Sequence, residues 1–131
     1  MSQWDAEILA QQLAQLGRDL QDEVKILGAL EESTADTEGL YRSLQELHED
    51  NLARALLRSE GTADTRKALA RLACVESRQE TEAASLEWSR MKGKLNTQRA
   101  NLQALHRRIE VGRSLLSREK SLLSLAGVGE V

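Results

Sequence analysis

Few residues of the chain have the types and spacing that metal binding or catalysis requires. His48, Glu49 and Asp50 are side chains of the kind that ligate metals, but they are consecutive. Consecutive residues of a helix point in different directions around its axis, so we expect no metal site there. Cys74 is the only cysteine. A nucleophilic thiol needs a neighbouring base or cation in a pocket, and the sequence nominates none.

The glycines near the end of the chain also lack a chemical role. Gly127 and Gly129 do not form a phosphate-binding loop, because such a loop follows a strand and opens a helix. A catalytic site further needs a pocket on which polar groups converge, and two long paired helices enclose no such volume. We therefore expect no catalytic residue, no cofactor and no metal, and a protein that is not an enzyme.

The feature that does recur along the chain is a row of mostly apolar residues at alternating three- and four-residue steps. From residue 88 onward this row contains Trp88, Met91, Leu95, Gln98, Leu102, Leu105, Ile109, Gly112, Leu116, Glu119 and Leu123. A seven-residue repeat sustained for about five heptads is typical of a helix that packs along one narrow seam. At roughly 1.5 Å per residue, a helix over 65–125 would be about 90 Å long, so its partner must also be long.

Composition indicates the all-α class. The chain of 131 residues has no proline and no phenylalanine, only 2% of its residues are aromatic, and 30% are charged. Leucine and alanine must therefore supply the buried surface that aromatic residues give to an ordinary globular core. Abundant Ala, Leu, Glu, Arg and Gln is the composition of long helices and coiled coils.

The best turn in the sequence divides this helical chain into two arms. Gly61 suits the left-handed position that ends a helix, and Thr62 can cap the next one. The expected single helical domain has a first arm over 4–59, a turn over 60–64, a second arm over 65–125 and a frayed tail over 126–131.

If the two arms pair antiparallel about this turn, residue i lies opposite roughly residue 122 − i. Leu13 then lies opposite Ile109, and the polar interruption at Glu23 lies opposite the one at Gln98. This coincidence favours a long antiparallel two-helix coiled-coil hairpin.

The first arm has a weak point near 33–37. This segment holds poor helix formers, and the phase of the leucines also shifts there. Leu30 predicts seam positions at 34, 37 and 41, whereas leucines occur at 40, 44 and 47. We expect a kink or a break, as at a coiled-coil stutter. The alternative architecture is a four-helix up-down bundle, broken near 33–37 and 93–96.

Charge is distributed unevenly. Residues 1–32 carry seven acids and two bases, whereas residues 88–120 carry nine bases and two acids. We interpret the basic segment as facing the acidic one within the chain; the alternative is contact with an acidic polymer or the periphery of a membrane. A net charge of −3 argues against a general nucleic-acid binder.

The sequence also bears on location. No run approaches the roughly 18 apolar residues that a membrane span needs, and the N-terminus lacks the pattern of a secretory signal. A lone cysteine fits a reducing compartment, so we expect a cytoplasmic protein.

More apolar residues are present than one seam can bury. The surplus residues lie off the seam: Ile8, Ile26, Leu57, Leu69, Leu86, Leu115, Leu122 and Leu125. They widen the apolar stripe toward the width found in bundles. We expect assembly with other helical chains, of the same or another protein. The predicted interaction residues are Trp88, Met91, Leu95, Gln98, Leu102, Leu105, Ile109, Leu115, Leu116, Leu122 and Leu123.

Residues 91–123 resemble a Qb-type SNARE motif. The resemblance rests on the pattern L-x-x-Q-R-x-x-L, which this chain has at Leu95, Gln98, Arg99 and Leu102, followed by heptad-spaced apolar residues. It implies that Gln98 is the central ionic-layer glutamine of a parallel four-helix fusion complex. Met91 and Leu95 would fill the layers before it, and Leu102, Leu105, Ile109, Leu116 and Leu123 would fill those after it. The chain departs from the family at Gly112 and Glu119, where layers are usually apolar, and we expect no membrane anchor after the motif.

Overall fold

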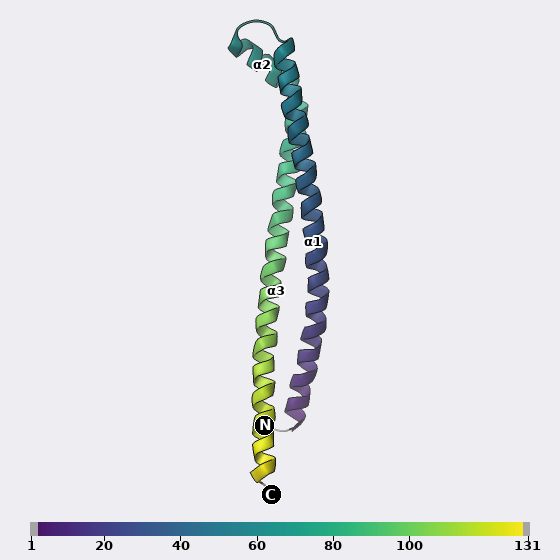
Figure 1. Cartoon of the computed structure of the whole chain (residues 1–131), viewed down its shortest axis with the longest axis vertical. Coiled ribbons are helices and arrows are strands. Elements are labelled where there is room, and N and C mark those ends of the chain that lie inside the picture. Colours follow the sequence, from purple (N-terminus) through teal and green to yellow (C-terminus); the bar gives the residue numbers. More distant parts are fainter. Residues whose placement is uncertain (1–2, 130–131) are drawn as a thin grey trace. The chain divides into compact units, whose positions relative to one another are not determined.

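The computed structural model describes residues 3–129, with side chains over 5–125, and contains three helices and no strand over that range (Figure 1). Helix α1 spans Gln3–Arg58, α2 spans Ala63–Ala73 and α3 spans Val75–Gly129. The predicted all-α class is confirmed. The third helix extends four residues past the predicted bound at 125; residues 130–131 of the predicted tail lie outside the described part of the chain.

The second arm, predicted as one helix, consists of two, which meet at Cys74. The Cys74 backbone has φ −111° and ψ 19°, outside the α-helical region, and its N–H donates to both the Ala70 and Arg71 carbonyl oxygens. Such a shared hydrogen bond is common where a helix ends. No glycine or proline lies between 62 and 92 to mark this break in the sequence.

The connection between α1 and α2 has the local chemistry that its sequence predicts. Gly61 has φ +109°, a value that L side chains rarely adopt. Thr62 then caps α2, because its hydroxyl oxygen accepts a hydrogen bond from the Thr65 N–H at 3.3 Å. Arg66 of α2 reaches back to α1, where its Nη2 donates to the Leu56 carbonyl at 3.0 Å. These contacts fix where the chain reverses.

The contacts divide the chain into two units. The terminal unit contains the described residues of Met1–Gly28 and Asn96–Val131, and the turn unit contains Ala29–Leu95. In the terminal unit Leu13 contacts Gly112 and Glu23 contacts Gln98, so α1 and α3 run antiparallel. The turn unit has the same direction of pairing, with His48 against Ser77 and the Leu44 carbonyl against Thr81.

The predicted register is close to the observed one. The opposition of Glu23 and Gln98 is confirmed by the hydrogen bonds between them. Leu13 contacts Gly112, which lies three residues, or about one helical turn, further along α3 than the predicted Ile109. Gly112 has no side chain and so gives no apolar signal in the heptad pattern. Its missing Cβ is what allows Leu13 to approach.

Residues 33–37 and 93–96 both lie inside uninterrupted helices. The breaks that the alternative four-helix bundle requires are therefore absent over the described residues, and the first arm is not broken. The apparent change of phase has another cause. Thr34, Thr37 and Tyr41 continue the seam as buried or half-buried residues, whereas Leu40 and Leu47 are 57% and 50% exposed.

Polar residues occupy this part of the seam because their hydrogen bonds are satisfied locally. The Thr34 hydroxyl donates to the Leu30 carbonyl at 2.6 Å, and the Thr37 hydroxyl donates to the Thr34 carbonyl at 2.9 Å. Across the pair, the Thr81 hydroxyl lies 3.3 Å from the Leu44 carbonyl. A buried hydroxyl with an acceptor carries little penalty. A search that counts only leucines assigns the wrong face of α1 here.

The turn geometry predicts opposite effects for two glycine substitutions within the turn unit. Gly61→Ala places a side chain at a positive φ and should lower the free energy of unfolding by about 1–2 kcal/mol. Gly39→Ala, in the interior of α1 with nothing within 4 Å of the added Cβ, should raise it by up to about 1 kcal/mol. Urea unfolding followed by far-UV circular dichroism measures both; equal effects would contradict the left-handed turn.

Candidate helix-binding surface

The structure separates the predicted interaction residues by exposure. Met91, Leu95, Gln98, Leu102, Leu105 and Ile109 are buried, and Trp88, Leu116 and Leu123 are half-buried. All nine lie on the seam of α3. Leu115 and Leu122 are exposed. The first group is already in contact within the chain, so only the second group is available to a partner without opening the helix pair.

Large apolar side chains are exposed in both units. Those of the terminal unit are Val24, Ile26, Val111, Leu115, Leu122 and Leu125, and those of the turn unit are Leu40, Leu47, Leu57, Leu69, Leu72 and Leu86. Over the described part of the chain, no side chain is less than 2% exposed. Two paired helices bury one stripe each, so a surplus of apolar residues stays in water.

A second heptad row on α3 was missed by sequence reasoning as a row. It lies one residue before the seam positions and contains Val111, Leu115, Arg118, Leu122 and Leu125. We call this row the outer stripe. Its members are spaced by four, three, four and three residues, which keeps them on one face of a helix. The signal is present in the sequence, where Leu115, Leu122 and Leu125 are among the surplus apolar residues; Val111 completes the spacing.

An apolar groove lies at the N-terminal end of the outer stripe, between the α1 and α3 segments of the terminal unit. It has a volume of about 370 Å³. Leu9, Leu13 and Leu16 line it from α1, and Val111 and Leu115 line it from α3. Arg107 and Arg108 also border it. The groove therefore combines an apolar floor with a basic edge, a combination suited to an amphipathic helix with acidic residues.

Gly112 lies in the wall of this groove, beside Leu13. A Cβ built on Gly112 would lie 2.5 Å from Cδ2 of Leu13, closer than real contacts allow. The absent side chain therefore leaves room for Leu13 to enter the seam. Leu13 and Gly112 both line the groove, so their close approach is part of its wall.

A polar pair interrupts the apolar seam of the terminal unit. Gln98 is 7% exposed, and its Nε2 donates to the Glu23 carbonyl oxygen at 3.1 Å and to a Glu23 carboxylate oxygen. Glu23 is half-buried. A buried polar pair of this kind adds little net stability, but it penalises any register in which either group faces an apolar side chain.

Trp88 lies in an aromatic and cationic cluster of the turn unit. Its ring stacks on Tyr41 with centroids 5.5 Å apart and an interplanar angle of 23°. Lys92 Nζ lies 3.8 Å from the ring centroid, and the Arg42 guanidinium carbon lies 5.9 Å from it. Cations over a tryptophan face are attracted by its quadrupole. These contacts occupy much of the ring surface that an interface would need.

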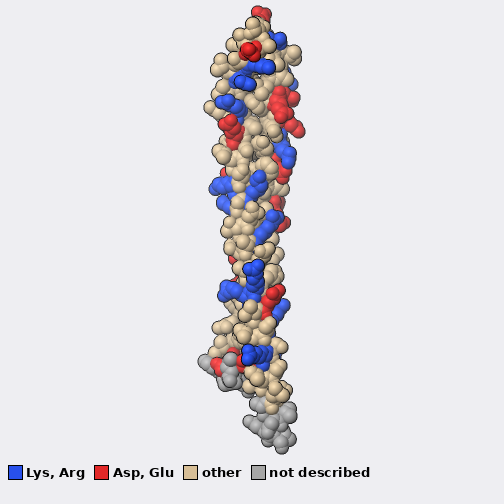
Figure 2. Space-filling model, turned by 90° about the vertical axis from the view of Figure 1, so that its left-hand side faces the viewer, with Lys and Arg blue, Asp and Glu red and all other residues tan. Residues whose placement is uncertain are grey.

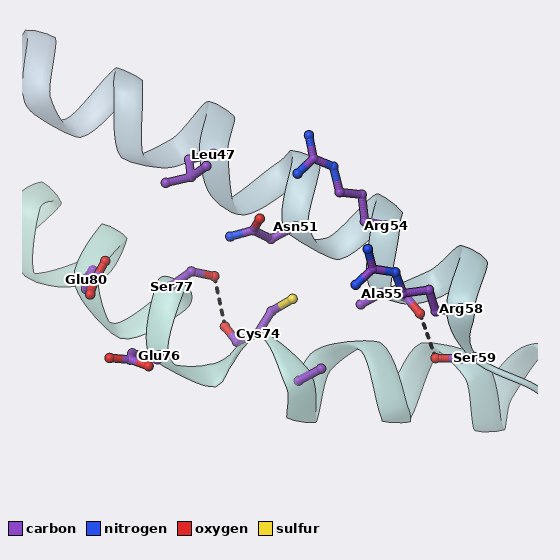
Figure 3. Close-up of a pocket in the computed structure, with 11 residues that line it drawn as sticks. Leu47, Asn51, Arg54, Ala55, Arg58, Ser59, Cys74, Glu76, Ser77 and Glu80 are labelled. Carbon is purple, nitrogen blue, oxygen red and sulfur yellow. Dashed lines mark hydrogen bonds between the residues drawn. The ribbon is translucent and has the colours of Figure 1, made fainter.

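A larger hollow in the turn unit is lined by polar side chains of α1 and α3 (Figure 3). It has a volume of about 670 Å³. Figure 3 shows Asn51 and Arg54 on α1 across from Cys74 and Ser77. Cys74 is buried, the Ser77 hydroxyl donates to the Cys74 carbonyl at 3.2 Å, and His48 Nδ1 lies 2.7 Å from the Ser77 oxygen. These bonds tie the α2–α3 junction to α1, which is a structural role.

Two carboxylates and a thiol line the same hollow without forming a cluster of metal ligands. Glu76 and Glu80 line it from α3, and Cys74 lies at its base. No three His, Cys, Asp or Glu side chains converge anywhere in the part of the chain whose side chains are described. Arg54 and Arg58 also line the hollow. Their positive charges would repel a metal cation.

Charged side chains lie mostly at the surface, and Figure 2 shows Lys and Arg scattered among uncharged residues on one face. Arg42 pairs with Glu38 and Arg90 pairs with Glu87, in each case within one helix. The hydrogen bond from Arg90 lowers the pKa of the Glu87 carboxyl and raises that of the guanidinium. Such exposed pairs contribute little to stability.

Comparisons of the chain with models of protein families, with curated proteins and with solved structures gave no match. None of the helices, over the residues searched, has an apolar stretch of the length that crosses a bilayer. The helices of the structure themselves place the chain in the all-α class.

The observed register predicts different costs for two neighbouring leucines of α1. Leu44→Gln puts a polar group into the seam and should lower the free energy of unfolding by about 1–2 kcal/mol. Leu40→Gln changes an exposed side chain and should alter it by less than about 0.5 kcal/mol. Both are measured by urea unfolding of the chain alone. The reverse order would mean that the leucine phase, and not the threonine phase, forms the seam.

The polar pair predicts an energetic coupling between α1 and α3. In a double-mutant cycle, Glu23→Ala and Gln98→Ala should show a coupling of about 1 kcal/mol or more, because the bond between them is partly buried and involves a carboxylate. A matched cycle on Gln15 and Asp19, which are hydrogen-bonded at the surface of α1, should give only about 0.2–0.5 kcal/mol. Equal couplings would remove the special role of the buried pair.

Proposed function

We propose that the protein is a non-enzymatic coiled-coil subunit that binds other helical chains and holds them in a larger assembly. In this proposal α1 and the α2–α3 arm form an antiparallel hairpin whose seam serves its own folding. The exposed apolar rows then bind the partners. A reducing compartment such as the cytoplasm fits Cys74, which is a free thiol.

The observation that carries the proposal is the number of large apolar side chains left in water. Fully burying a leucine or valine contributes roughly 1.5–3 kcal/mol. The half-exposed members of the outer stripe would thus contribute about 1 kcal/mol each when covered. Monomeric proteins rarely leave apolar residues exposed in contiguous rows, and such rows mark interaction sites.

A SNARE-like fusion helix is the second candidate. It is supported by the buried Gln98, which has Leu95 and Leu102 as buried seam neighbours on α3, as an ionic layer would require. In this alternative, Gln98 would exchange its contact with Glu23 for contacts with three other helices in a parallel bundle. The two candidates therefore differ in the seam that partners use: the inner one for fusion, the outer stripe for a scaffold.

Purification of the tagged full chain from cells tests the proposal. We expect it to co-purify with one or more helical chains in fixed stoichiometry, or to sediment as an oligomer. Replacing Leu115 and Leu122 by glutamine should reduce this assembly at least tenfold while the helical content is retained, because both leucines are exposed.

A matched control keeps the result interpretable. Ser114→Gln and Ser121→Gln also add glutamine to exposed positions of α3, one residue before each leucine, and should leave assembly unchanged. A wild-type chain that sediments as a stable, cooperative monomer at micromolar concentration, with no stoichiometric partner, would refute the proposal. Partners bound through Gln98 and the inner seam would favour the fusion candidate.

A further inference from the structure

The outer stripe has the spacing of a complete docking seam. Val111, Leu115, Leu122 and Leu125 are 60%, 47%, 50% and 69% exposed. Val111, Leu115, Arg118 and Leu122 lie one residue before the seam positions Gly112, Leu116, Glu119 and Leu123, and Leu125 continues their row, so α3 carries two adjacent heptad rows over 111–125. A helix with one row packs against one neighbour; a second row offset by one residue faces a second neighbour.

The groove of the terminal unit extends this seam onto α1. At the level of Val111 and Leu115, the side chains of Leu9, Leu13 and Leu16 form the opposite wall of the groove. A helix bound along the outer stripe would therefore contact both α1 and α3 near Val111 and Leu115. That is the position of a third helix in a bundle, where each helix contacts two others.

The charge on the stripe selects the kind of helix that fits. Arg118 is exposed and occupies the middle position of the stripe, between Leu115 and Leu122. Two copies of the stripe packed antiparallel, or parallel in register, would bring Arg118 against Arg118. Like charges brought together at a contact oppose that pairing. Arg107 and Arg108 at the border of the groove add positive charge on the same edge.

We propose that the outer stripe binds an amphipathic helix of a different protein, which has leucine-like residues at heptad spacing and a carboxylate opposite Arg118. This inference rests on the proposed function and names the partner class and the site. The apolar residues of the partner cover Val111, Leu115, Leu122 and Leu125. Its carboxylate pairs with Arg118, and acidic residues along its edge face Arg107 and Arg108.

Two synthetic helical peptides test the charge rule on the full chain. Both have four heptads with leucine at the core positions; one has glutamate at the central core position and the other has lysine. By fluorescence anisotropy, the wild type should bind the glutamate peptide at least tenfold more tightly than the lysine peptide. Arg118→Glu should reverse this preference. The preference should shrink as salt is raised, because the charges are partly exposed.

Matched leucine variants test the location. Leu115→Gln with Leu122→Gln should weaken binding of the glutamate peptide at least tenfold, whereas Leu57→Gln with Leu86→Gln, exposed leucines of the turn unit, should not. Circular dichroism and sedimentation of each variant establish that it is folded. The reciprocal switch at Arg118 requires only a folded chain, so it stands even if a leucine variant fails to fold.

The outcomes separate this inference from the broader one. Equal binding of the two peptides, no binding of either, or loss of binding only in the turn-unit variant would overturn the docking site. A wild-type oligomer that the Leu115→Gln, Leu122→Gln variant dissociates would make the stripe an interface between copies, which overturns the heterotypic partner but leaves the scaffold proposal intact. A wild-type monomer that has no cellular partner but still binds the glutamate peptide selectively would overturn the scaffold proposal and leave the docking site intact.

Discussion

The structure depends on one constraint: two paired helices bury only the residues that face each other along a seam. In the terminal unit the seam of α3 is filled mainly by Leu102, Leu105 and Ile109. Over the described residues of this unit no further helix covers the pair, so apolar residues off the seam, such as Val24 and Leu115, stay in contact with water. The exposed leucines are a direct result of this geometry, and the assignment of an interaction surface follows from it.

The two units use the seam differently. On the seam of α3, the terminal unit buries aliphatic side chains together with two polar residues, Glu119 and Gln98, and Gln98 is paired with Glu23. The turn unit places Thr34, Tyr41 and His48 at the facing positions and satisfies them by hydrogen bonds and ring stacking. Hydrogen bonds inside a protein contribute modest net stability but penalise mismatched pairing strongly. The turn unit thus adds specific polar contacts of α1 to the apolar residues that it also buries, such as Met91 and Leu95.

Much of the fold could be predicted because its signals are local. Gly61 and Thr62 mark the chain reversal through backbone conformation and capping, and both act as expected. The heptad row of α3 is regular enough to define its buried face. The end of α2 at Cys74 could not be foreseen, since no residue there has a conformational preference that ends a helix. It depends on contacts with α1 that only the folded chain provides.

The leucine phase of α1 shows a second limit. The leucines at 40 and 47 indicate a shift of the seam, because apolar residues usually face inward, whereas threonine and histidine hold the facing positions in the structure. The spacing of leucines predicts the facing positions only where buried apolar area stabilises the helix pair. It fails where hydrogen bonds allow polar residues to occupy those positions. For the candidate surface, Leu115 and Leu122 could be selected as surplus residues. The groove beside them required the approach of Leu13 to Gly112, which depends on three-dimensional packing.

That approach also acts as a stop against longitudinal sliding. If α1 slipped by one heptad along α3 in the terminal unit, Leu13 would meet Leu105 or Glu119 in place of Gly112. The first collision overfills the space between the helices, and the second presses a methyl group against a carboxylate. The missing side chain at Gly112 therefore fixes the register of two otherwise repetitive helices. It also fixes the position along α3 at which a third helix would enter the groove.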